Sequence, residues 1–396
     1  MLHIEEISGL SALKEFVQFQ IELYKGVDAF VPPMVGMEVD LLNPQKNPAF
    51  DFCETVFYIV RSDDARARLS PYRGIIGRIA GIINHSSNKI TGRRQCRFCY
   101  CDFIDDEEVS RLLLDTVADW GRKMGMNELV GPLGLTDLDY EGCLVEGFDQ
   151  LATMVELYNH PYYPRHFEAY GMKPEAYWNG YRMPVPASGY SERHWRVAEI
   201  ARQRYGLRVV RFTDMRMLTH KYGRRIFELY NQAYAPIYGF SPITDRQIDY
   251  YIALFLKQLR LDLIRVITDQ DDNLLAFGFC TPSLSRAQQR ARGHMFPFGW
   301  WHLAKAVYMT SNSRLGRWLG GGTDTVDLML IAVRPDMQGK GVNALLFTEL
   351  IPQFVRNGYK WIETNNELEH NHKVQNLWSD FQPVRHKRRC TYLVQI

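Results

Sequence analysis

One stretch decides the fold: Val333-Arg334-Pro335-Asp336-Met337-Gln338-Gly339-Lys340-Gly341-Val342. An apolar run, Val326 to Val333, leads into it, and apolar residues at helical spacing follow it as far as Phe354. This order predicts a strand, a glycine turn and a helix N-terminus. The first N–H groups of a helix have no partner within the helix, and the helix dipole adds positive potential, so the turn suits an anion. Gly339 and Gly341 let the main chain approach that anion closely.

The spacing of these glycines differs from that of a P-loop nucleotidase, and it is not the Gly-x-Gly-x-x-Gly of a Rossmann fold. The motif Val-x-Pro-x-x-Gln-Gly-x-Gly-x-x-x-x-Leu, from Val333 to Leu346, resembles the acetyl-CoA loop of the GNAT acyltransferases. The resemblance implies that the loop binds the CoA diphosphate and that the preceding strand binds the pantetheine arm and the thioester. The residues implied are Leu330, Ile331, Ala332, Val333, Gln338, Gly339, Lys340, Gly341 and Val342.

The next segments also resemble the GNAT pattern. Tyr359 to Thr364 reads as a buried strand, and Asn371 to Phe381 resembles the family's Asn-x-x-Ala-x-x-Leu-Tyr-x-x-x-Gly-Phe helix. Trp378 stands where the family usually has a tyrosine that protonates the leaving thiolate, and the glycine before Phe381 is missing. Asn365 and Asn371 are candidate cofactor contacts, and Asn371 is equally well suited to cap its helix.

Composition bounds the function. The chain has 396 residues, 46% of them apolar, which favours a globular protein of two domains. Its net charge of +2 creates no strong positive electrostatic field that would attract nucleic acid. We find no segment long enough to span a membrane and no secretion signal. Seven cysteines without framework spacing indicate a reducing cytoplasm. Strand alternation predicts that Cys99 and Cys101 share one face as small apolar residues rather than metal ligands, and we expect no metal.

The fold class predicted is α/β (α+β), with two tandem GNAT-like domains, each a mixed central sheet flanked by helices. Residues 207–396 form the acyltransferase domain, residues 186–206 a helical linker, and residues 1–185 a degenerate copy in which the same order of elements recurs. The copy lacks the glycine loop. In its place stands Ile104 to Val109, with four consecutive carboxylates, Asp105 to Glu108. These satisfy the helix dipole themselves and repel a diphosphate, since like charges about 4 Å apart cost about 1 kcal/mol in water.

An insert of about residues 283–323 interrupts the second domain. It contains Gly293 to Trp301, which is rich in aromatic residues. Because large aromatic side chains are costly to leave in water, we expect the insert to pack into the core. The alternative is a lid over a pocket for an apolar acyl chain or acceptor.

Acyl transfer to an amine requires a polarised thioester, a neutral amine and a proton for the leaving thiolate. The family resemblance implies that an amide of the strand, from Leu330, Ile331 or Ala332, polarises the carbonyl. The candidate bases are Asp327 and Glu363, with Glu367 just beyond. Tyr392 and Tyr308 are candidates to replace the missing tyrosine, and His294 and His302 are weaker ones.

We therefore predict a CoA-dependent N-acyltransferase, in the first instance an acetyltransferase, that uses acetyl-CoA or another acyl-CoA and a small-molecule or peptide amine. Direct attack needs no covalent enzyme intermediate. A scaffold protein that binds acyl-CoA without turnover is the alternative from another class. A transferase that uses a longer acyl or an aminoacyl donor is the third. The sequence leaves oligomerisation and the acceptor open.

Overall fold

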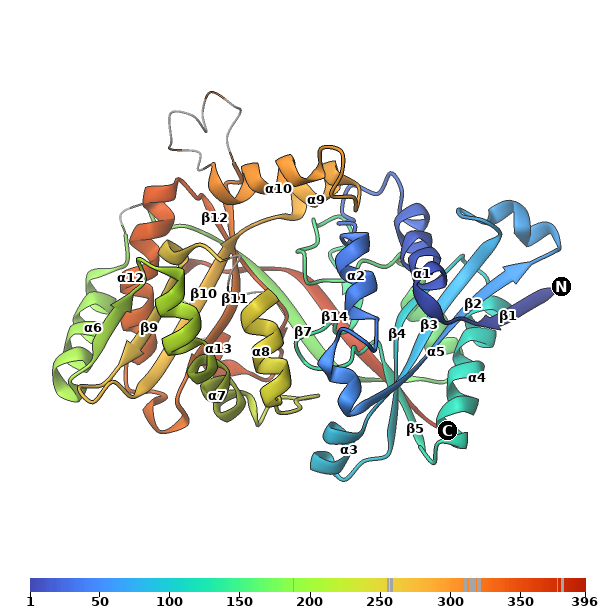
Figure 1. Ribbon diagram of the computed structural model, residues 1–396, viewed down its shortest axis with the longest axis horizontal. Helices are drawn as coiled ribbons and strands as arrows, with labels where there is room; N and C mark the ends of the chain where they lie inside the picture. Colours follow the sequence, from blue (N-terminus) through green and yellow to red (C-terminus); the bar gives the residue numbers. More distant parts are fainter. Residues whose placement is uncertain are drawn as a thin grey trace.

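The computed structural model describes residues 1–187, 189–254, 256, 259–309, 312, 318, 322–375, 377–378 and 381–396. Within them, one mixed sheet of fourteen strands runs through the molecule, with helices packed along it (Figure 1). The predicted α/β class and the repetition of one order of elements in both halves are confirmed.

The first half alternates strands with amphipathic helices. Its strands are β1 (Leu2–Glu6), β2 (Cys53–Ser62), β3 (Ile75–Asn84), β4 (Gln95–Phe103), β5 (Glu128–Gly131), β6 (Cys143–Glu146) and β7 (Lys173–Pro184). Its helices are α1 (Gly9–Leu23), α2 (Val35–Leu41), α3 (His85–Thr91), α4 (Glu107–Lys123) and α5 (Tyr163–Ala169), with short 3-10 turns η1 (Pro48–Asp51) and η2 (Ala65–Leu69). Helix α6 (Glu192–Tyr205) leads to the second half.

The second half repeats the order. Its strands are β8 (Arg208–Arg211), β9 (Ile264–Thr268), β10 (Leu274–Pro282), β11 (Thr325–Val333), β12 (Trp361–Thr364), β13 (Glu367–Leu368) and β14 (Val384–Gln395). Its helices are η3 (Met217–Tyr222), α7 (Gly223–Tyr234), α8 (Asp245–Leu254), η5 (Leu261–Leu263), α9 (Ser285–Ala291), α10 (Gly299–Tyr308), η6 (Pro335–Met337), α12 (Val342–Asn357) and α13 (His372–Gln375).

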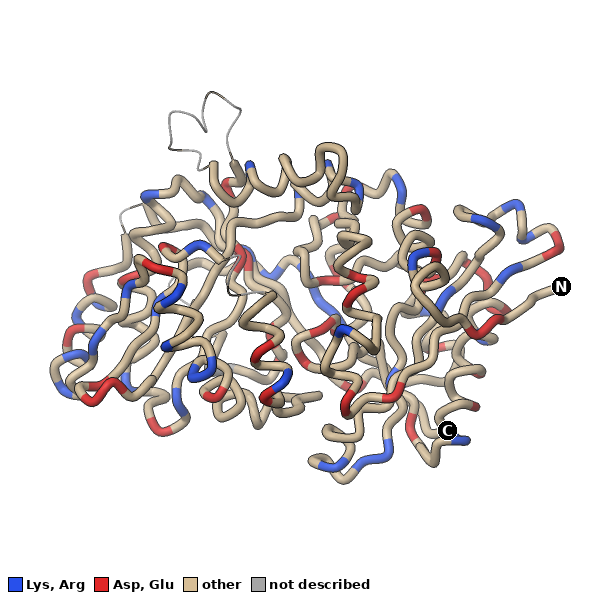
Figure 2. The backbone as a smooth tube through the Cα atoms, viewed as in Figure 1, with Lys and Arg blue, Asp and Glu red and all other residues tan. Residues whose placement is uncertain are grey.

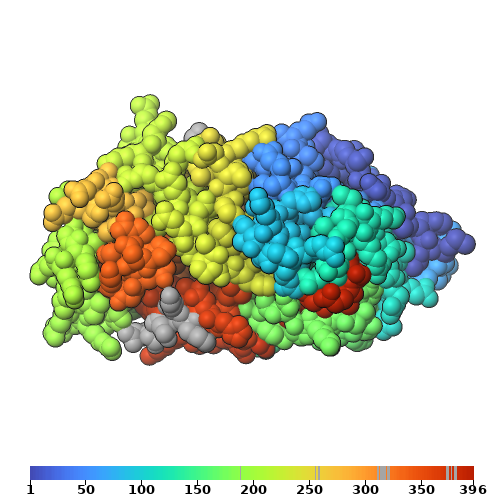
Figure 3. Space-filling model, turned by 90° about the horizontal axis from the view of Figure 1, so that it is seen from below, coloured from blue at the N-terminus to red at the C-terminus, as the bar shows by residue number. Residues whose placement is uncertain are grey.

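The two halves exchange their last strands. The sheet order is β1-β2-β3-β4-β5-β14-β7-β12-β11-β10-β9-β8. Thus β14, from the second half, pairs with β5 of the first through Tyr392 and Gly131, and β7, from the first half, pairs with β12 through Met183 and Ile362. Figure 3 shows the red C-terminal residues among the cyan and green of the first half. The predicted boundary between two domains, at residues 186–206, stays a prediction, because one continuous sheet contains strands of both halves.

A β-bulge in β4 corrects one prediction. Arg78 pairs with Asp102 and Ala80 pairs with Cys99, so β4 carries an extra residue, and Tyr100 has a φ of 49°. A bulge resets the alternation of side chains. Cys99 therefore packs against the core beneath α1 and Cys101 against the core beneath α4, and the prediction that they share a face was wrong. All seven cysteines are buried and free.

The aromatic insert also differs from its prediction. Helices α9 and α10 lie along the upper edge of the molecule in Figure 1. Exposed aromatic side chains stand on α10 and on the connection between the two helices. Phe296 is 78% exposed, Phe298 70% and Tyr308 75%. The expectation of core packing was wrong for these side chains, which point into solvent. Residues 310–311, 313–317 and 319–321 of the insert lie outside the described residues. None of the helices described is long and apolar enough to cross a bilayer.

Candidate active site

The turn between β11 and α12 has the conformation that the sequence predicts. Gly339 and Gly341 take φ values of 74° and 81°, in the left-handed region that glycine tolerates best. Helix α12 begins at Val342 without a side-chain cap, and its first bond runs from the Leu345 N–H to the Gly341 carbonyl. The preceding N–H groups of the helix therefore have no intrahelical acceptor. Nothing lies within 4 Å of the position that a Cβ of Gly339 would take, so this side of the turn is open.

Neighbouring side chains hold the turn in place. The Gln338 side-chain amide donates to the Val333 carbonyl at 3.2 Å, which ties the turn to the end of β11. Arg334 forms two bonds to Asp336, at 2.6 and 3.0 Å, which offsets the one carboxylate of the turn. The other side of the turn is packed, because a Cβ on Gly341 would lie 3.1 Å from Val197 Cγ1 of α6. The absence of a side chain at Gly341 thus also allows α6 to pack against the turn.

A gap opens beside β11 just before the turn. The parallel pairing of β11 with β12 ends at Leu328 and Thr364, whereas β11 continues to Val333. On its other side β11 carries a bulge, since Phe279 pairs with Leu330 and Cys280 with Leu328, which leaves Met329 as the extra residue. The strands β11 and β12 therefore diverge at the bulge, and main-chain groups of β11 face the gap between them.

The register decides which groups these are. The Arg334 N–H donates to the Leu275 carbonyl of β10, so the alternate residues Ala332 and Leu330 also bond to β10. The N–H and carbonyl of Ile331 and of Val333 point the opposite way, into the gap. Of the three amides that the sequence named, Ile331 alone has this orientation in the ladder.

Polar side chains from two further segments, α7 and the residues after β12, reach this gap. The Tyr234 hydroxyl of α7 donates to the Ile331 carbonyl at 3.1 Å, and the Asn365 side-chain amide donates to the Leu328 carbonyl at 2.9 Å. Burial raises the pKa of Tyr234, and the nearby Glu367 adds to the increase. Sequence reasoning missed Tyr234, whose place one turn after Tyr230 reads as ordinary helix packing.

Glu367 is the carboxyl group with the most distinctive environment here. It follows β12 at the start of β13, and burial raises its pKa to about 7. The Trp378 indole N–H donates to its Oε1 at 2.8 Å, while Oε2 has no partner in the described part of the chain. The tryptophan that replaces the usual tyrosine therefore holds a carboxyl group. The helix predicted from Asn371 to Phe381 is short, since α13 spans His372–Gln375, and Asn376, Ser379 and Asp380 lie outside the described residues.

Asp327 and Glu363 lie side by side on β11 and β12, within a buried cluster of charges. Burial and the neighbouring Glu363 raise the pKa of Asp327 well above its usual range, which favours its protonated form. Glu363 Oε1 lies 2.6 Å from His386 Nε2 and 3.0 Å from Lys387 Nζ of β14. Lys387 also binds Glu156 of the first half. This cluster ties β14 to β12 of the second half and to Glu156 of the first half.

The remaining candidates are dispersed. Tyr392 lies in the core of the first half, with its ring 5.5 Å from that of Phe167, and is not brought together with Asp327. Tyr308 and His294 are exposed on the insert. The Asn371 N–H bonds to the Leu368 carbonyl as the chain enters α13.

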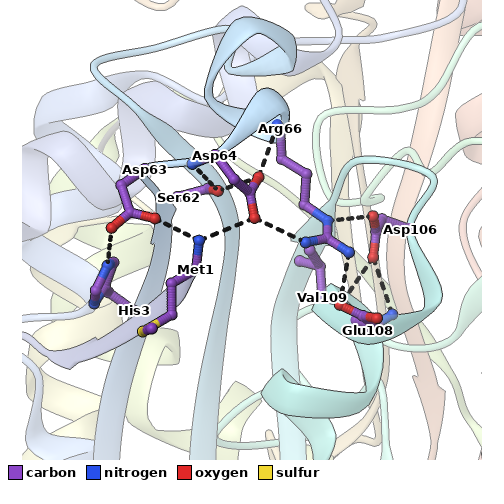
Figure 4. A network of polar contacts seen from close by, with 9 residues as sticks. All are labelled: Met1, His3, Ser62, Asp63, Asp64, Arg66, Asp106, Glu108 and Val109. Carbon is purple, nitrogen blue, oxygen red and sulfur yellow. Dashed lines mark hydrogen bonds and ion pairs between the residues drawn. The ribbon is translucent and has the colours of Figure 1, made fainter.

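The corresponding turn of the first half is closed. Figure 4 shows the Asp106 carboxylate accepting from the N–H groups of Glu108 and Val109, at 3.0 and 3.2 Å, at the start of α4. Arg66 donates to Asp106 at 2.7 Å and to Glu108 at 2.6 Å. The helix N-terminus thus already carries its anion, as the sequence predicts.

Comparison with known proteins decides the fold. No family model matches the chain. Over its whole length the structure superposes on a tandem GNAT protein from the clavulanic acid biosynthesis pathway, with a TM-score of 0.55, 10% identity and 98% of that chain covered. The chain has the tandem GNAT fold. A GCN5-related N-acetyltransferase from Sphaerobacter thermophilus gives a TM-score of 0.51 at 9% identity, and covers 100% of this chain and 95% of its own.

Two curated proteins are similar in sequence to this tandem GNAT chain. Protein YghO of Escherichia coli (strain K12) is 24% identical over 391 residues, which are 97% of this chain and 93% of that protein. The bacterial ceramide synthase of Caulobacter vibrioides (strain NA1000 / CB15N) is 26% identical over 306 residues, 76% of this chain and 74% of that protein. The superposition on the two GNAT structures confirms, for the fold, the GNAT resemblance of the sequence.

Proposed function

We propose that the protein is an N-acyltransferase that moves an acyl group from acyl-CoA to an amine. The observation that carries the proposal is the open turn at Gly339, whose helix amides lack intrahelical partners, beside the gap where β11 leaves β12. Unpaired amides at a helix N-terminus suit the diphosphate of CoA. The exposed main-chain edge of β11 suits the amides of the pantetheine arm.

The residues at the gap supply what the reaction needs. The amine attacks the thioester carbonyl, a C–N bond forms, and the C–S bond breaks. We assign the Ile331 N–H to the developing oxyanion, because it points into the gap. We assign Glu367 to accept the amine proton, directly or through water, because a carboxyl group with a pKa near 7 is half ionised at neutral pH. The Tyr234 hydroxyl is the donor that we assign to the leaving thiolate.

The acceptor that we propose is a long-chain amine, with a long-chain acyl-CoA as donor. The support is similarity over 306 residues to a bacterial ceramide synthase, since a ceramide is the amide of a fatty acid and a long-chain amino alcohol. The alternative pair of substrates is acetyl-CoA and a small amine, which the sequence alone led us to expect.

The test is a thiol-release assay with purified protein. Acetyl-CoA and palmitoyl-CoA are each paired with sphinganine, a polyamine and a peptide amine, and the amide product is identified by mass spectrometry. We expect free CoA and N-acyl sphinganine from palmitoyl-CoA. Product from acetyl-CoA and a small amine overturns the long-chain assignment but keeps the transferase. Tight CoA binding without product in any pair supports the scaffold alternative, which the replacement of tyrosine by Trp378 motivates.

A further inference from the structure

The connection between α9 and α10 presents an apolar surface that the fold does not cover. His294 to Phe298, Trp300 and Trp301 are all exposed, and Trp300 and Trp301 are 47% and 38% accessible. Large aromatic side chains gathered in one exposed segment mark a binding surface. We call the side chains of Met295, Phe296, Phe298, Trp300 and Trp301 the aromatic surface.

The insert itself carries charge of a single sign. From Asn273 to Thr323 the chain contains no aspartate and no glutamate (Figure 2). Beside the aromatic surface lies a depression of about 640 Å³, lined by Arg286, Arg290 and Arg292 together with Gln289 and His302. In the described part of the chain, none of these three guanidinium groups pairs with a carboxylate. A partner of this region is therefore anionic as well as apolar.

The segment is held firmly against the first half. The Gln289 side chain donates to the carbonyls of Asp28 and Phe30, both at 2.8 Å, and the Val35 N–H donates to the Gly293 carbonyl at 2.9 Å. A Cβ on Gly293 would lie 2.8 Å from the Pro33 carbonyl oxygen, so the contact is close. The aromatic side chains are thus presented outward from a fixed base.

We propose that the aromatic surface and the three arginines dock the protein on the surface of an anionic lipid bilayer. Tryptophan and phenylalanine insert at the level of the headgroups, and arginines beside them bind lipid phosphates. The segment lies on the membrane and does not cross it. This inference does not depend on the proposed function, because none of these residues belongs to the gap beside β11.

Vesicle co-sedimentation of the full chain tests the proposal, with vesicles of phosphatidylcholine alone or mixed with phosphatidylglycerol. We expect the wild type to sediment with the anionic vesicles and to be released by salt. The affinity of the variant Phe296→Ser/Phe298→Ser/Trp300→Ser for anionic vesicles should be lower by about tenfold or more. The variant Arg286→Gln/Arg290→Gln/Arg292→Gln should lose the preference for anionic vesicles.

The matched control is Trp195→Ser/Ile200→Ser, which removes two exposed apolar side chains from α6, 46% and 57% accessible. It should sediment like the wild type. A wild type that binds neither vesicle, or an aromatic variant that binds as the wild type does, overturns the proposal. So does a change in molecular mass of the aromatic variant without vesicles, since the surface is then a contact between copies. Unchanged unfolding temperatures show that the variants are folded.

Discussion

The turns that begin α4 and α12 occupy the same place in the two halves and differ in what meets the helix N-terminus. At α4, Asp106 caps the helix and Arg66 neutralises the carboxylates around it. At α12, Gly341 stands at the cap position, and the first amides of the helix are left without a side-chain cap. The same strand, turn and helix thus form either a helix start that its own carboxylate closes or one whose first amides stay without a side-chain cap. The difference lies in a few side chains, not in the fold.

The comparison assumes that the halves form one body joined by β7 and β14, and Lys387→Met tests this with the largest expected effect. Lys387 is buried between Glu156 and Glu363, and its loss removes the cation that these two buried carboxylates share, leaving Arg389 3.7 Å from Glu156 and His386 beside Glu363. We expect about 3–5 kcal/mol less stability in urea unfolding at neutral pH. Arg385→Met, on the same strand but in the exposed pair with Glu146, should cost about 1 kcal/mol or less. Equal losses would contradict a joint role for the buried cluster.

The buried pair of Lys387 and Glu156 also makes the stability of the fold depend on pH. Burial alone would raise the pKa of Glu156, but Lys387 and Arg389 lower it to about 2, below its ordinary value of 4.5. Because the folded pKa is depressed, this stability is present above about pH 4.5 and is lost as the pH falls toward 2. In Lys387→Met this loss of stability with acid should be reduced.

The halves also differ after the strand that follows each helix. Glu367 follows β12, whereas Pro132, Leu133 and Gly134 follow β5. We expect Glu367→Gln to lower turnover by about 10²–10³-fold without changing CoA affinity, since it removes the proton acceptor alone. Wild-type activity should rise with pH through about 7, as Glu367 ionises, and the variant should lack this step. Glu369→Gln, which loses an ion pair with Arg388, is the control. An unchanged rate in Glu367→Gln would remove it from the mechanism.

The variant Gly339→Glu places a carboxylate in the open turn before α12, like the carboxylates in the turn before α4. We expect CoA to bind about 30-fold more weakly, or about 2 kcal/mol, because the new carboxylate repels the diphosphate at close range. Gly26→Glu provides the matched control, because Gly26 also has a positive φ, 86°, and open space around it. Unchanged affinity in calorimetry would refute the assignment of the turn.

The smallest effect is expected from the reverse change. Replacing Asp105, Asp106, Glu107 and Glu108 by their amides should cost about 1 kcal/mol of stability. Arg66 loses its ion pairs with Asp106 and Glu108 but keeps the one with Asp64, and an asparagine in place of Asp106 still caps α4. Calorimetry should still give one CoA per chain. A second binding event would show that the first half is silenced by charge alone.

Much of this architecture follows from local pattern. The strand before Arg334, the left-handed glycines and the helix after them are fixed by a few residues, and the acidic replacement in the first half is equally local. The exchange of β7 and β14 could not be predicted, because alternation of side chains identifies a strand and not its partner. The bulge at Tyr100 is similarly invisible, since it depends on the register with β3.

The candidate site was predicted in part for the same reason. The turn and the amide of Ile331 belong to one continuous stretch of chain. Tyr234 and the bond from Trp378 to Glu367 bring together residues far apart in sequence, and a tryptophan at a tyrosine position suggests a loss rather than a new contact. The exposed aromatic surface contradicts the expectation of burial, which considered the cost of contact with water but no partner outside the chain.

The exchanged strands have a consequence for synthesis. Gln395 of β14 meets Glu128 of β5 across 267 residues of chain. At about 5–20 residues per second, the ribosome needs on the order of tens of seconds to deliver this partner after β5 has emerged. During that time the nascent first half exposes an unpaired strand edge, which is prone to wrong pairing. Chaperone dependence during translation is therefore expected to concentrate in this interval.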